Sequence, residues 1–421
     1  MLEMLRNAWK VKELRNKMIY TVLMLLVYRV GAILPVPGVN VQAIGDAISG
    51  NGVLELFNMF NGGALANFTI FATGVTPYIT ASIVMQLLTV AIPKLEQLSK
   101  EGEEGRRKIN KITRYVGIAM AFVTSIGTMI GFGSTILNHP VWYNYLFIAV
   151  IHTAGTAFTI WLGDRISSKG IGNGISLLIF INIISSIPTQ IGSIARNMSE
   201  GVISYWLIPV FIVVVVAIIV AVVFVDLGER RITVQYAKRV VGRKLYGGQS
   251  THIPLKVNNT GVMPLIFAMT IMQFPALIMM FWPNASFTLA YQRVMHTTSP
   301  LYLILQTVFI IFFAYFYSAI SFNPVDVSKN IQQNGGFIPG IRPGKPTSEH
   351  LARISNRITM FSAVFMALLA LVPTILTGLL PTGIISGFTA TSILIVVSVA
   401  LETSKQLEAQ LMMRHYKGFL K

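Results

Sequence analysis

The 421-residue chain contains no cysteine. This absence excludes disulfide bonds, thiolate metal sites and cysteine nucleophiles, and it leaves the redox compartment open. Charged residues are also scarce, at 12% of the chain, against about 25% in an average soluble domain. Because 53% of the residues are hydrophobic and the mean hydropathy is +0.65, the composition predicts a membrane protein.

Acidic residues are half as frequent as basic ones, 16 against 33, and the net charge is +17. Those near the apolar windows, such as Asp164, Asp226 and Glu229, stand at the window ends, whereas ion-coupled transporters usually carry ionisable groups inside the membrane. The chain also lacks the Gly-x-Ser-x-Gly elbow, the His-Glu-x-x-His zinc motif and paired intramembrane aspartates. Lone His152 is better explained as a packed helix residue than as a ligand. We therefore expect no enzyme, no cofactor and no metal site.

The first 17 residues, MLEMLRNAWKVKELRNK, are too charged for a cleavable signal peptide. They interleave Leu2, Leu5, Trp9 and Leu14 with five basic residues. This pattern predicts an amphipathic helix lying at the cytoplasmic membrane surface.

Apolar windows of about 20 residues, the length that crosses a ~30 Å hydrocarbon core, recur along the chain. The windows are residues 18–36, 75–92, 115–137, 145–163, 171–188, 206–227, 260–282, 300–323, 358–379 and 384–402. They predict an all-α polytopic membrane protein with ten transmembrane helices.

All Lys and Arg residues except Arg29, Arg196 and Arg293 lie in the two terminal segments or in alternate loops. The positive-inside rule makes these loops and both termini cytoplasmic. The loops at about 228–258 and 324–357 are longer and more basic than orientation requires. They are either an oversized orientation signal or a docking surface for RNA, an acidic protein or lipid headgroups.

An internal repeat relates the second and seventh windows. GVTPYITASIVMQL (74–87) and GVMPLIFAMTIMQF (261–274) share Gly, Val, Pro, Ile, Ala, Met and Gln at aligned positions. Chance similarity of apolar helices is the alternative, but hydrophobicity alone does not select Gly, Pro and Gln. An offset of five helices predicts two inverted halves of five helices, with the functional site at their interface near mid-membrane.

The repeat divides the chain into five expected parts. They are the N-terminal segment 1–17, an N-terminal half 18–190, an external hinge loop 191–205, a C-terminal half 206–402 and a cytoplasmic tail 403–421.

The stretch NGGALANFTIFATGVTPY (61–78) stands before the second window. It is too short to span and is bounded by glycines, and Pro77 suits the first turn of the next helix. We expect a short helix folded back into a cavity, over about 62–73, hinged by its glycines. A packing element without motion is the alternative.

Several long strings together resemble the SecY family of bacterial protein-translocation channels. They are GGALANFTIFATGVTPYITASIVMQLL, EGEEGRRKI, RYVGIAM, GIGNGISLLIF, RRITVQYAKRVVGRKLYGGQSTHIPLKVNNTGVMPLIFA, FNPVDVSKNIQQNGGFIPGIRPGKPT and TSILIVV. The resemblance runs from the first window to the tenth.

The resemblance implies an hourglass pore between the halves, narrowed by a ring of apolar side chains. The ring positions are Val75, Ile79, Ile175, Ile179, Ile266 and Ile395. The residue spacing agrees, because 75/79 and 175/179 are i,i+4 pairs on one helix face and positions 79 and 266 are equivalent in the repeat. Valine at position 75 is smaller than the family's usual isoleucine, which implies slightly looser sealing. Ordinary helix packing would explain any one of these residues alone, and it is their joint pattern that favours a pore.

The resemblance further implies that the glycine-bounded stretch is a plug, which fills the outer funnel of the closed channel. Its residues are Gly62, Gly63, Ala64, Leu65, Ala66, Asn67, Phe68, Thr69, Ile70 and Phe71. The repeated second and seventh helices correspond to a lateral gate toward lipid, with Thr80, Gln86 and Asn258 as candidate seam residues. Structural helix–helix hydrogen bonding is the alternative for these three.

Arg243 and Lys244 in the first basic loop, and Arg342 in the second, match positions that engage the SecA motor or the translating ribosome. Small SecE and SecG subunits, signal sequences, nascent polypeptides and the bilayer itself are the other implied partners, in a bacterial cytoplasmic membrane. The implied function is translocation of secretory polypeptides and lateral release of transmembrane segments. A secondary transporter built on an inverted repeat is the first alternative, and a scaffold without a conduit is the second.

Overall fold

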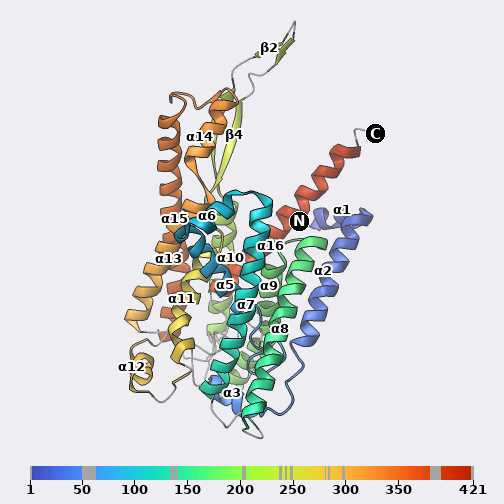
Figure 1. The fold of residues 1–421 in the computed structure, drawn as a ribbon, viewed down its shortest axis with the longest axis vertical. Coiled ribbons are helices and arrows are strands. Elements are labelled where there is room, and N and C mark those ends of the chain that lie inside the picture. Colours follow the sequence, from blue (N-terminus) through green and yellow to red (C-terminus); the bar gives the residue numbers. More distant parts are fainter. Residues whose placement is uncertain are drawn as a thin grey trace.

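The computed structural model describes residues 2–49, 63–132, 137, 141–201, 205–236, 239–241, 244–246, 250–279, 281–282, 285–295, 299–379 and 390–418. Most of these residues are helical, as expected for an all-α membrane protein (Figure 1). The helices are α1 (Leu2–Lys10), α2 (Lys12–Gly31), α3 (Val41–Ser49), α5 (Thr76–Ala91), α6 (Pro93–Lys100), α7 (Glu103–Phe132), α8 (Trp142–Lys169), α9 (Gly174–Ser199), α10 (Leu207–Leu227), α11 (Met263–Met279), α12 (Ser286–Val294), α13 (Pro300–Ser321), α14 (Pro324–Gln333), α15 (Lys345–Leu379) and α16 (Ala390–Gly418).

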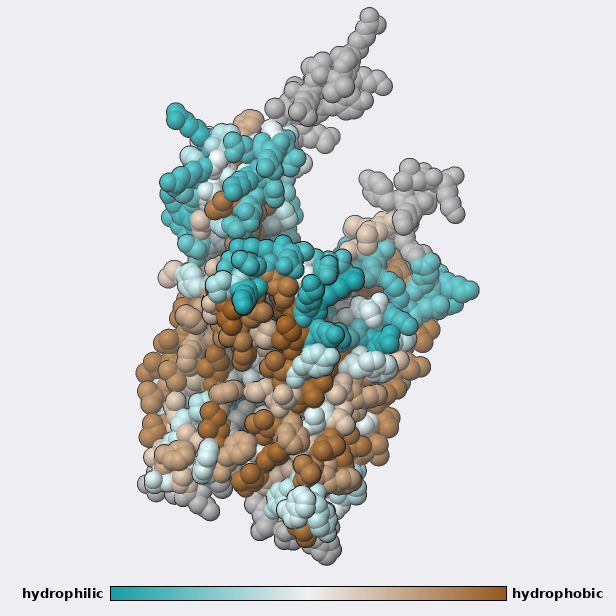
Figure 2. All heavy atoms as spheres, in the orientation of Figure 1, coloured by the Kyte–Doolittle hydropathy of each residue, from teal (hydrophilic) through white to brown (hydrophobic). Residues whose placement is uncertain are grey.

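Each of the ten apolar windows falls on one of these helices, namely α2, α5, α7 to α11, α13, α15 and α16. By length and composition, six helices of the described chain can cross a membrane, or seven if α5 and α6, bent by 99°, form one span. Apolar side chains form a broad band below a hydrophilic end of the molecule (Figure 2). The protein is therefore multi-pass, and the count of ten stays a prediction.

The two halves repeat the same packing order. In the first half α5 packs on α7 and α7 on α8, and in the second α11 packs on α13 and α13 on α15. The repeated motifs also share a backbone conformation, because Gly74 and Gly261 have φ angles of +53° and +61°. A residue with a side chain is strained there, so glycine turns the chain into each helix at the same point.

Helix α9 is longer than its window, which ended at residue 188. Pro188 lies inside α9, and the helix continues to Ser199. Hydroxyl groups beside the proline bond within the helix, since Ser186 donates to Ile183 O and Thr189 donates to Ser186 O. Such local hydrogen bonding lets a membrane helix pass through a proline without ending.

The short helix expected over residues 62–73 is a series of turns over the described residues 63–75. Its backbone bonds to the chain after α2, with Ile70 N donating to Leu34 O and Val36 N to Phe68 O. Phe68 has a φ of +42°, which a helix does not admit. These bonds to the chain after α2 add to turns within the segment, such as Phe68 N to Leu65 O and Ala72 N to Thr69 O. We call residues 63–74 the folded-back segment.

The first basic loop carries β-strands that the all-α expectation did not include. Strands β1 (Glu229–Tyr236) and β4 (Ser250–Lys256) pair antiparallel, and β5 (Gly336–Phe337) adds to the other edge of β1. A second, small pair joins β2 (Arg239–Val241) to β3 (Lys244–Tyr246).

An apolar cluster holds the three-stranded sheet against α14 and the start of α15. Its buried members are Ile232, Val234, Leu255, Ile331, Ile338 and Leu351. The two basic loops therefore form one folded unit, which projects beyond the apolar band (Figures 1 and 2).

Both ends of the described chain lie at the hydrophilic end of the molecule (Figure 1). Helix α1 and the late part of α16 meet there in an apolar cluster that includes Ala8, Leu14, Ile171 and Leu407. This arrangement agrees with an even number of membrane crossings.

Candidate functional site

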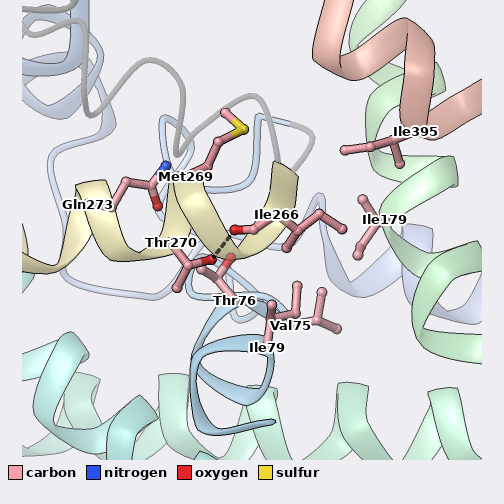
Figure 3. A pocket seen from close by; sticks show the side chains of 9 residues that line it. All are labelled: Val75, Thr76, Ile79, Ile179, Ile266, Met269, Thr270, Gln273 and Ile395. Carbon is pink, nitrogen blue, oxygen red and sulfur yellow. Dashed lines mark hydrogen bonds between the residues drawn. The ribbon is translucent and has the colours of Figure 1, made fainter. Parts of the chain in front are cut away.

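A small cavity lies between the halves, where α5, α9, α11 and α16 converge (Figure 3). Its volume is about 40 Å³, room for no more than a few water molecules. The lining residues are Val75, Thr76, Ile79, Ile179, Ile266, Met269, Thr270, Gln273 and Ile395. Five of the six expected ring residues therefore face one space.

Helix geometry explains how these side chains meet. Val75 is the N-cap residue of α5, and Ile79 follows one turn later on the same face. Ile266 holds the equivalent place near the start of α11, while Ile179 and Ile395 approach from α9 and α16. Val75, Ile179 and Ile395 are buried, at 2%, 7% and 1% exposure, so the centre of the site is closed to solvent.

The sixth expected residue, Ile175, does not line the cavity. It lies one turn before Ile179 on α9, close to Gly163 of α8, where a Cβ would lie 2.5 Å from Ile175 Cδ1. All six residues nevertheless belong to, or pack against, a single apolar cluster. The structure places Ile175 in the wall behind the cavity.

One side of the cavity is polar, a feature that the sequence analysis did not single out. Thr76 of α5, and Thr270 and Gln273 of α11, contribute their side chains there, and Thr270 Oγ1 donates to Ile266 O at 2.8 Å. The repeat held a signal for Gln273, because it is the equivalent of Gln86. The polar side faces the junction of the two repeated helices.

The folded-back segment lies against α2 and α8. The Phe71 ring stacks between Tyr28 and Phe158, with centroid distances of 5.4 and 5.9 Å. Phe68 packs edge-on against His152, whose Nδ1 is 3.0 Å from Ser125 Oγ. His152 is thus a packed helix residue, as expected. Of the expected plug residues, Gly62 lies outside the described residues.

The remaining plug residues fall into buried and exposed members. Ala64, Leu65, Phe68, Thr69 and Phe71 are at most 5% exposed, whereas Gly63, Ala66 and Ile70 are partly buried and Asn67 is exposed. Asn67 Nδ2 donates to Gly63 O at 3.3 Å. The segment therefore presents one apolar face to the N-terminal half and a polar tip to its surroundings.

Helices α5 and α11 meet along an apolar seam that includes Ile83, Leu265 and Ala268. Of the expected seam residues, Thr80 donates to Thr76 O at 3.1 Å and Gln86 to Ser82 Oγ at 3.5 Å, both within α5. Asn258 precedes α11, and its Nδ2 donates to Asp226 Oδ1 at 2.6 Å. These contacts tie each residue to its own half.

The acidic residues at the window ends have structural partners. Asp164 of α8 pairs with Arg114 of α7 at 2.6 Å, and Asp226 also accepts a hydrogen bond from Ser398 of α16. Among the described residues, no cluster of three or more His, Asp or Glu side chains is arranged to hold a metal ion. The cavity itself has no ionisable lining residue.

At the hydrophilic end, Arg342 is exposed on the turn between β5 and α15. The turn is fixed by buried hydroxyls, because Thr347 Oγ1 donates to Arg342 O and Ser328 Oγ donates to Gly344 O, each at 2.8 Å. Lys244 begins β3. Arg243 lies outside the described residues.

Two bundles of membrane helices that close around an apolar constriction define a membrane channel. A family model of SecY matches residues 69–404 of the chain. The chain belongs to the SecY family.

Full-length relatives agree with this assignment. Protein translocase subunit SecY of Streptomyces coelicolor is 44% identical over 440 residues, and that of Bacillus subtilis is 42% identical over 434 residues. In both cases the similarity covers 100% of each chain.

Solved structures share the fold. A protein-conducting channel is 19% identical with a TM-score of 0.67, and it covers 93% of this chain and 91% of its own. Sec61 in the canine ribosome-channel complex is 17% identical with a TM-score of 0.62, with the same coverage of 93% and 91%. The expected fold class is therefore confirmed.

Proposed function

We propose that the chain forms the pore of a protein translocase, passing secretory polypeptides across a bacterial cytoplasmic membrane and releasing transmembrane segments sideways into lipid. One observation carries the proposal: apolar side chains from four helices, two in each half, converge on one small cavity between the halves. A channel subunit of this kind is not an enzyme. The SecY relatives and channel structures favour it over a secondary transporter.

The ring works through the physics of apolar surfaces. Val75, Ile79, Ile179, Ile266 and Ile395 offer no hydrogen bonds to water or ions, so a narrow passage among them dewets and blocks conduction. The same side chains pack around a polypeptide of any sequence, because dispersion and apolar burial need no directional partner. Ile175 supports the ring from behind.

The folded-back segment acts as the plug in this proposal. It is joined directly to Val75, and its apolar face covers one side of the entrance to the ring. A solved SecY structure with a TM-score of 0.66 and 20% identity concerns a plug domain that stabilises the closed channel and maintains a membrane seal. We assign the same role to residues 63–73 here.

The seam between α5 and α11 serves as the lateral gate. Its apolar contacts exchange readily for those of an apolar signal sequence, since each buried apolar side chain gains about 1.5 to 3 kcal/mol. Thr76, Thr270 and Gln273 give the gate its polar inner edge, and Thr80 and Gln86 lie further along α5. Asn258 holds α11 in place from its N-terminal end.

The two basic loops are the docking surface for a motor or ribosome, with Arg342 beside the sheet of β1, β4 and β5, and with Arg243 and Lys244 in the stretch between β1 and β4. Fixed turns suit an exposed guanidinium to bidentate contacts with phosphate or carboxylate. The canine Sec61 relative is part of a ribosome complex, and the yeast Ssh1 complex is bound to the 80S ribosome. SecA, SecE and SecG complete the proposed assembly, and both termini are cytoplasmic.

Disulfide crosslinking tests the pore directly, since the chain has no native cysteine. Ile79→Cys and Ile179→Cys are combined with a secretory substrate that has a cysteine in its middle and is arrested during translocation. We expect adducts at both positions that require SecA and ATP. Val213→Cys on α10, 67% exposed on the lipid side, is the matched control and forms none.

Robust translocation without an adduct at position 79 or 179 would overturn the pore assignment. Adducts of equal yield at position 213 would show that the substrate passes outside the cavity.

A further inference from the structure

The junction between the folded-back segment and α5 is held by hydroxyl groups of α8. Gly74 O accepts a hydrogen bond from Thr156 Oγ1 at 3.3 Å, and it lies 3.4 Å from Thr159 Oγ1, which shares its proton with Thr156 O at 2.8 Å. Thr156 Oγ1 also lies 2.9 Å from Thr73 Oγ1, the shortest of these contacts between α8 and the junction. Both α8 threonines are fully buried.

Two glycines bring the segment close enough for these bonds. A Cβ on Gly155 would lie 2.1 Å from Ile70 O, so α8 contacts the segment backbone directly. A Cβ on Gly31 of α2 would lie 2.2 Å from the Phe71 ring. The backbone of Ile70 and the ring of Phe71, just before Thr73 in the chain, therefore pack directly on glycines of α8 and α2.

The position of the bonds matters because Val75 follows Gly74 immediately. Gly74 has the left-handed φ that would allow it to act as a hinge, yet its carbonyl is bonded to α8. The Gly74 carbonyl shares a peptide plane with Val75, so these bonds hold the start of α5 against α8. A rotation about Gly74 that moves the segment carries Thr73 with it and separates its hydroxyl from Thr156. Opening at this hinge therefore requires the loss of the Thr73–Thr156 bond.

From these contacts we infer that Thr156 and Thr159 are positioning residues of the channel. They hold the Gly74 carbonyl, and Thr156 holds the Thr73 hydroxyl, so that Val75 and the folded-back segment stay together in the closed arrangement. The inference rests on the proposed channel function. It means that α8, which contributes no lining residue to the cavity, helps to keep the channel closed.

The test compares valine and serine at position 156. Thr156→Val keeps the shape and removes both contacts, whereas Thr156→Ser keeps the hydroxyl. The matched control is Thr153→Val on the same helix, where the hydroxyl donates only to Ala149 O within α8 at 2.6 Å. Each variant is made in the complete translocase, reconstituted in vesicles.

Two readouts separate positioning from folding. One is ion leak through the idle channel, and the other is the reaction rate of a maleimide with a cysteine placed at Ala72, which is fully buried in the closed segment. Thr156→Val should raise the ion leak and the maleimide reaction rate roughly three- to tenfold, because that factor corresponds to the net free energy of one buried hydrogen bond. Thr156→Ser and Thr153→Val should leave both near the native values.

Thr73→Val provides an independent arm that removes the other partner of the shortest contact. If the contact acts as inferred, Thr73→Val raises both readouts. The double variant with Thr156→Val should then match Thr156→Val alone, and it should exceed Thr73→Val only by the share of the bond from Thr156 to Gly74 O. This arm decides the matter if Thr156→Val does not assemble with its partners.

Native leak and native Ala72→Cys reactivity in both Thr156→Val and Thr73→Val would overturn the positioning role. If the Ile79 and Ile179 crosslinks form in those variants, the channel proposal stands without it. Absence of the crosslinks in the native chain would instead overturn the channel proposal.

Discussion

At the residue scale, the site depends on side chains that offer neither hydrogen bonds nor charge to water and ions. The ring consists of valine and isoleucine side chains, which can be buried without hydrogen-bond partners. None of the described lining residues is ionisable. Polar side chains enter only on the gate side, through Thr76, Thr270 and Gln273. A constriction of this kind blocks ions by leaving them unsolvated rather than by binding them.

This account predicts the effect of a polar group in the ring. Ile179→Ser should raise idle ion leak by roughly tenfold, because the closed state loses about 1.5 kcal/mol of apolar burial and gains a site that water can wet. Conductance across planar bilayers measures the leak. Val213→Ser, a substitution at a lipid-facing residue that is 67% exposed, is the control and should not alter it. Equal leak in the two variants would place the seal elsewhere.

At the element scale, the two basic loops act as one folded unit. The antiparallel pair of β1 and β4 would be marginal alone, as isolated two-stranded pairs are in water. It gains stability from the cluster that joins Ile232 and Leu255 to Ile331 of α14 and Leu351 of α15. The unit therefore presents Arg342 at a fixed height above the membrane helices.

Arg342→Glu should weaken motor- or ribosome-driven translocation by at least tenfold if this turn carries docking, because a reversed charge at a contact costs about 2 kcal/mol or more. Binding of SecA or ribosomes to reconstituted vesicles measures the loss. Thr347→Val, which frees the turn but keeps the charge, should show a smaller loss. Lys111 is an exposed residue of α7, and Lys111→Glu makes the same charge change away from the turn. This variant should bind SecA or ribosomes normally. A loss as large for Lys111→Glu would indicate only a general charge effect.

At the scale of the whole molecule, charge and hydrophobicity set the orientation. The basic loops and both chain ends gather at the hydrophilic end, beyond the apolar band (Figures 1 and 2). The positive-inside rule predicts that this end faces the cytoplasm. Helix α8 begins at the opposite end with Trp142, which is 75% exposed.

Single cysteines test this orientation in intact cells. An impermeant maleimide should label Trp142→Cys from outside, and it should label Met413→Cys only after the membrane is opened. Met413 is 63% exposed near the end of α16, so burial does not protect it. The native, cysteine-free chain is the blank. Labelling of Met413→Cys in intact cells would reverse the topology.

The sequence was sufficient for features that are local or repeated along the chain. Each apolar window coincides with a helix, because the cost of placing backbone groups in lipid leaves few alternatives to a helix. The repeat at residues 74 and 261 is matched by the φ angles of both glycines. The family resemblance extended these patterns to the ring positions.

Other features required contacts between segments far apart in the chain. The segment at 63–74 is a set of turns because its backbone bonds to Leu34 and Val36 as well as to itself, and Phe68 has a positive φ. The hairpin β1–β4 carried an alternating apolar pattern in ERRITVQY, but its pairing depends on α14 and α15. Asn258 is tied to Asp226, a contact that its place near the seventh window did not indicate.

By itself the sequence determined the class of protein, the apolar helical segments, the internal duplication and the charge of each loop. These features follow from the hydrophobicity and charge of individual residues and need no knowledge of how the chain packs. Only the tertiary structure decided that Ile175 stands behind the cavity while Ile179 lines it, and that Thr156 and Thr159 reach Gly74. Those outcomes depend on how closely α8, α9 and the folded-back segment approach one another. The approach is set by glycines such as Gly155 and Gly163, whose missing side chains have meaning only once the helices are packed.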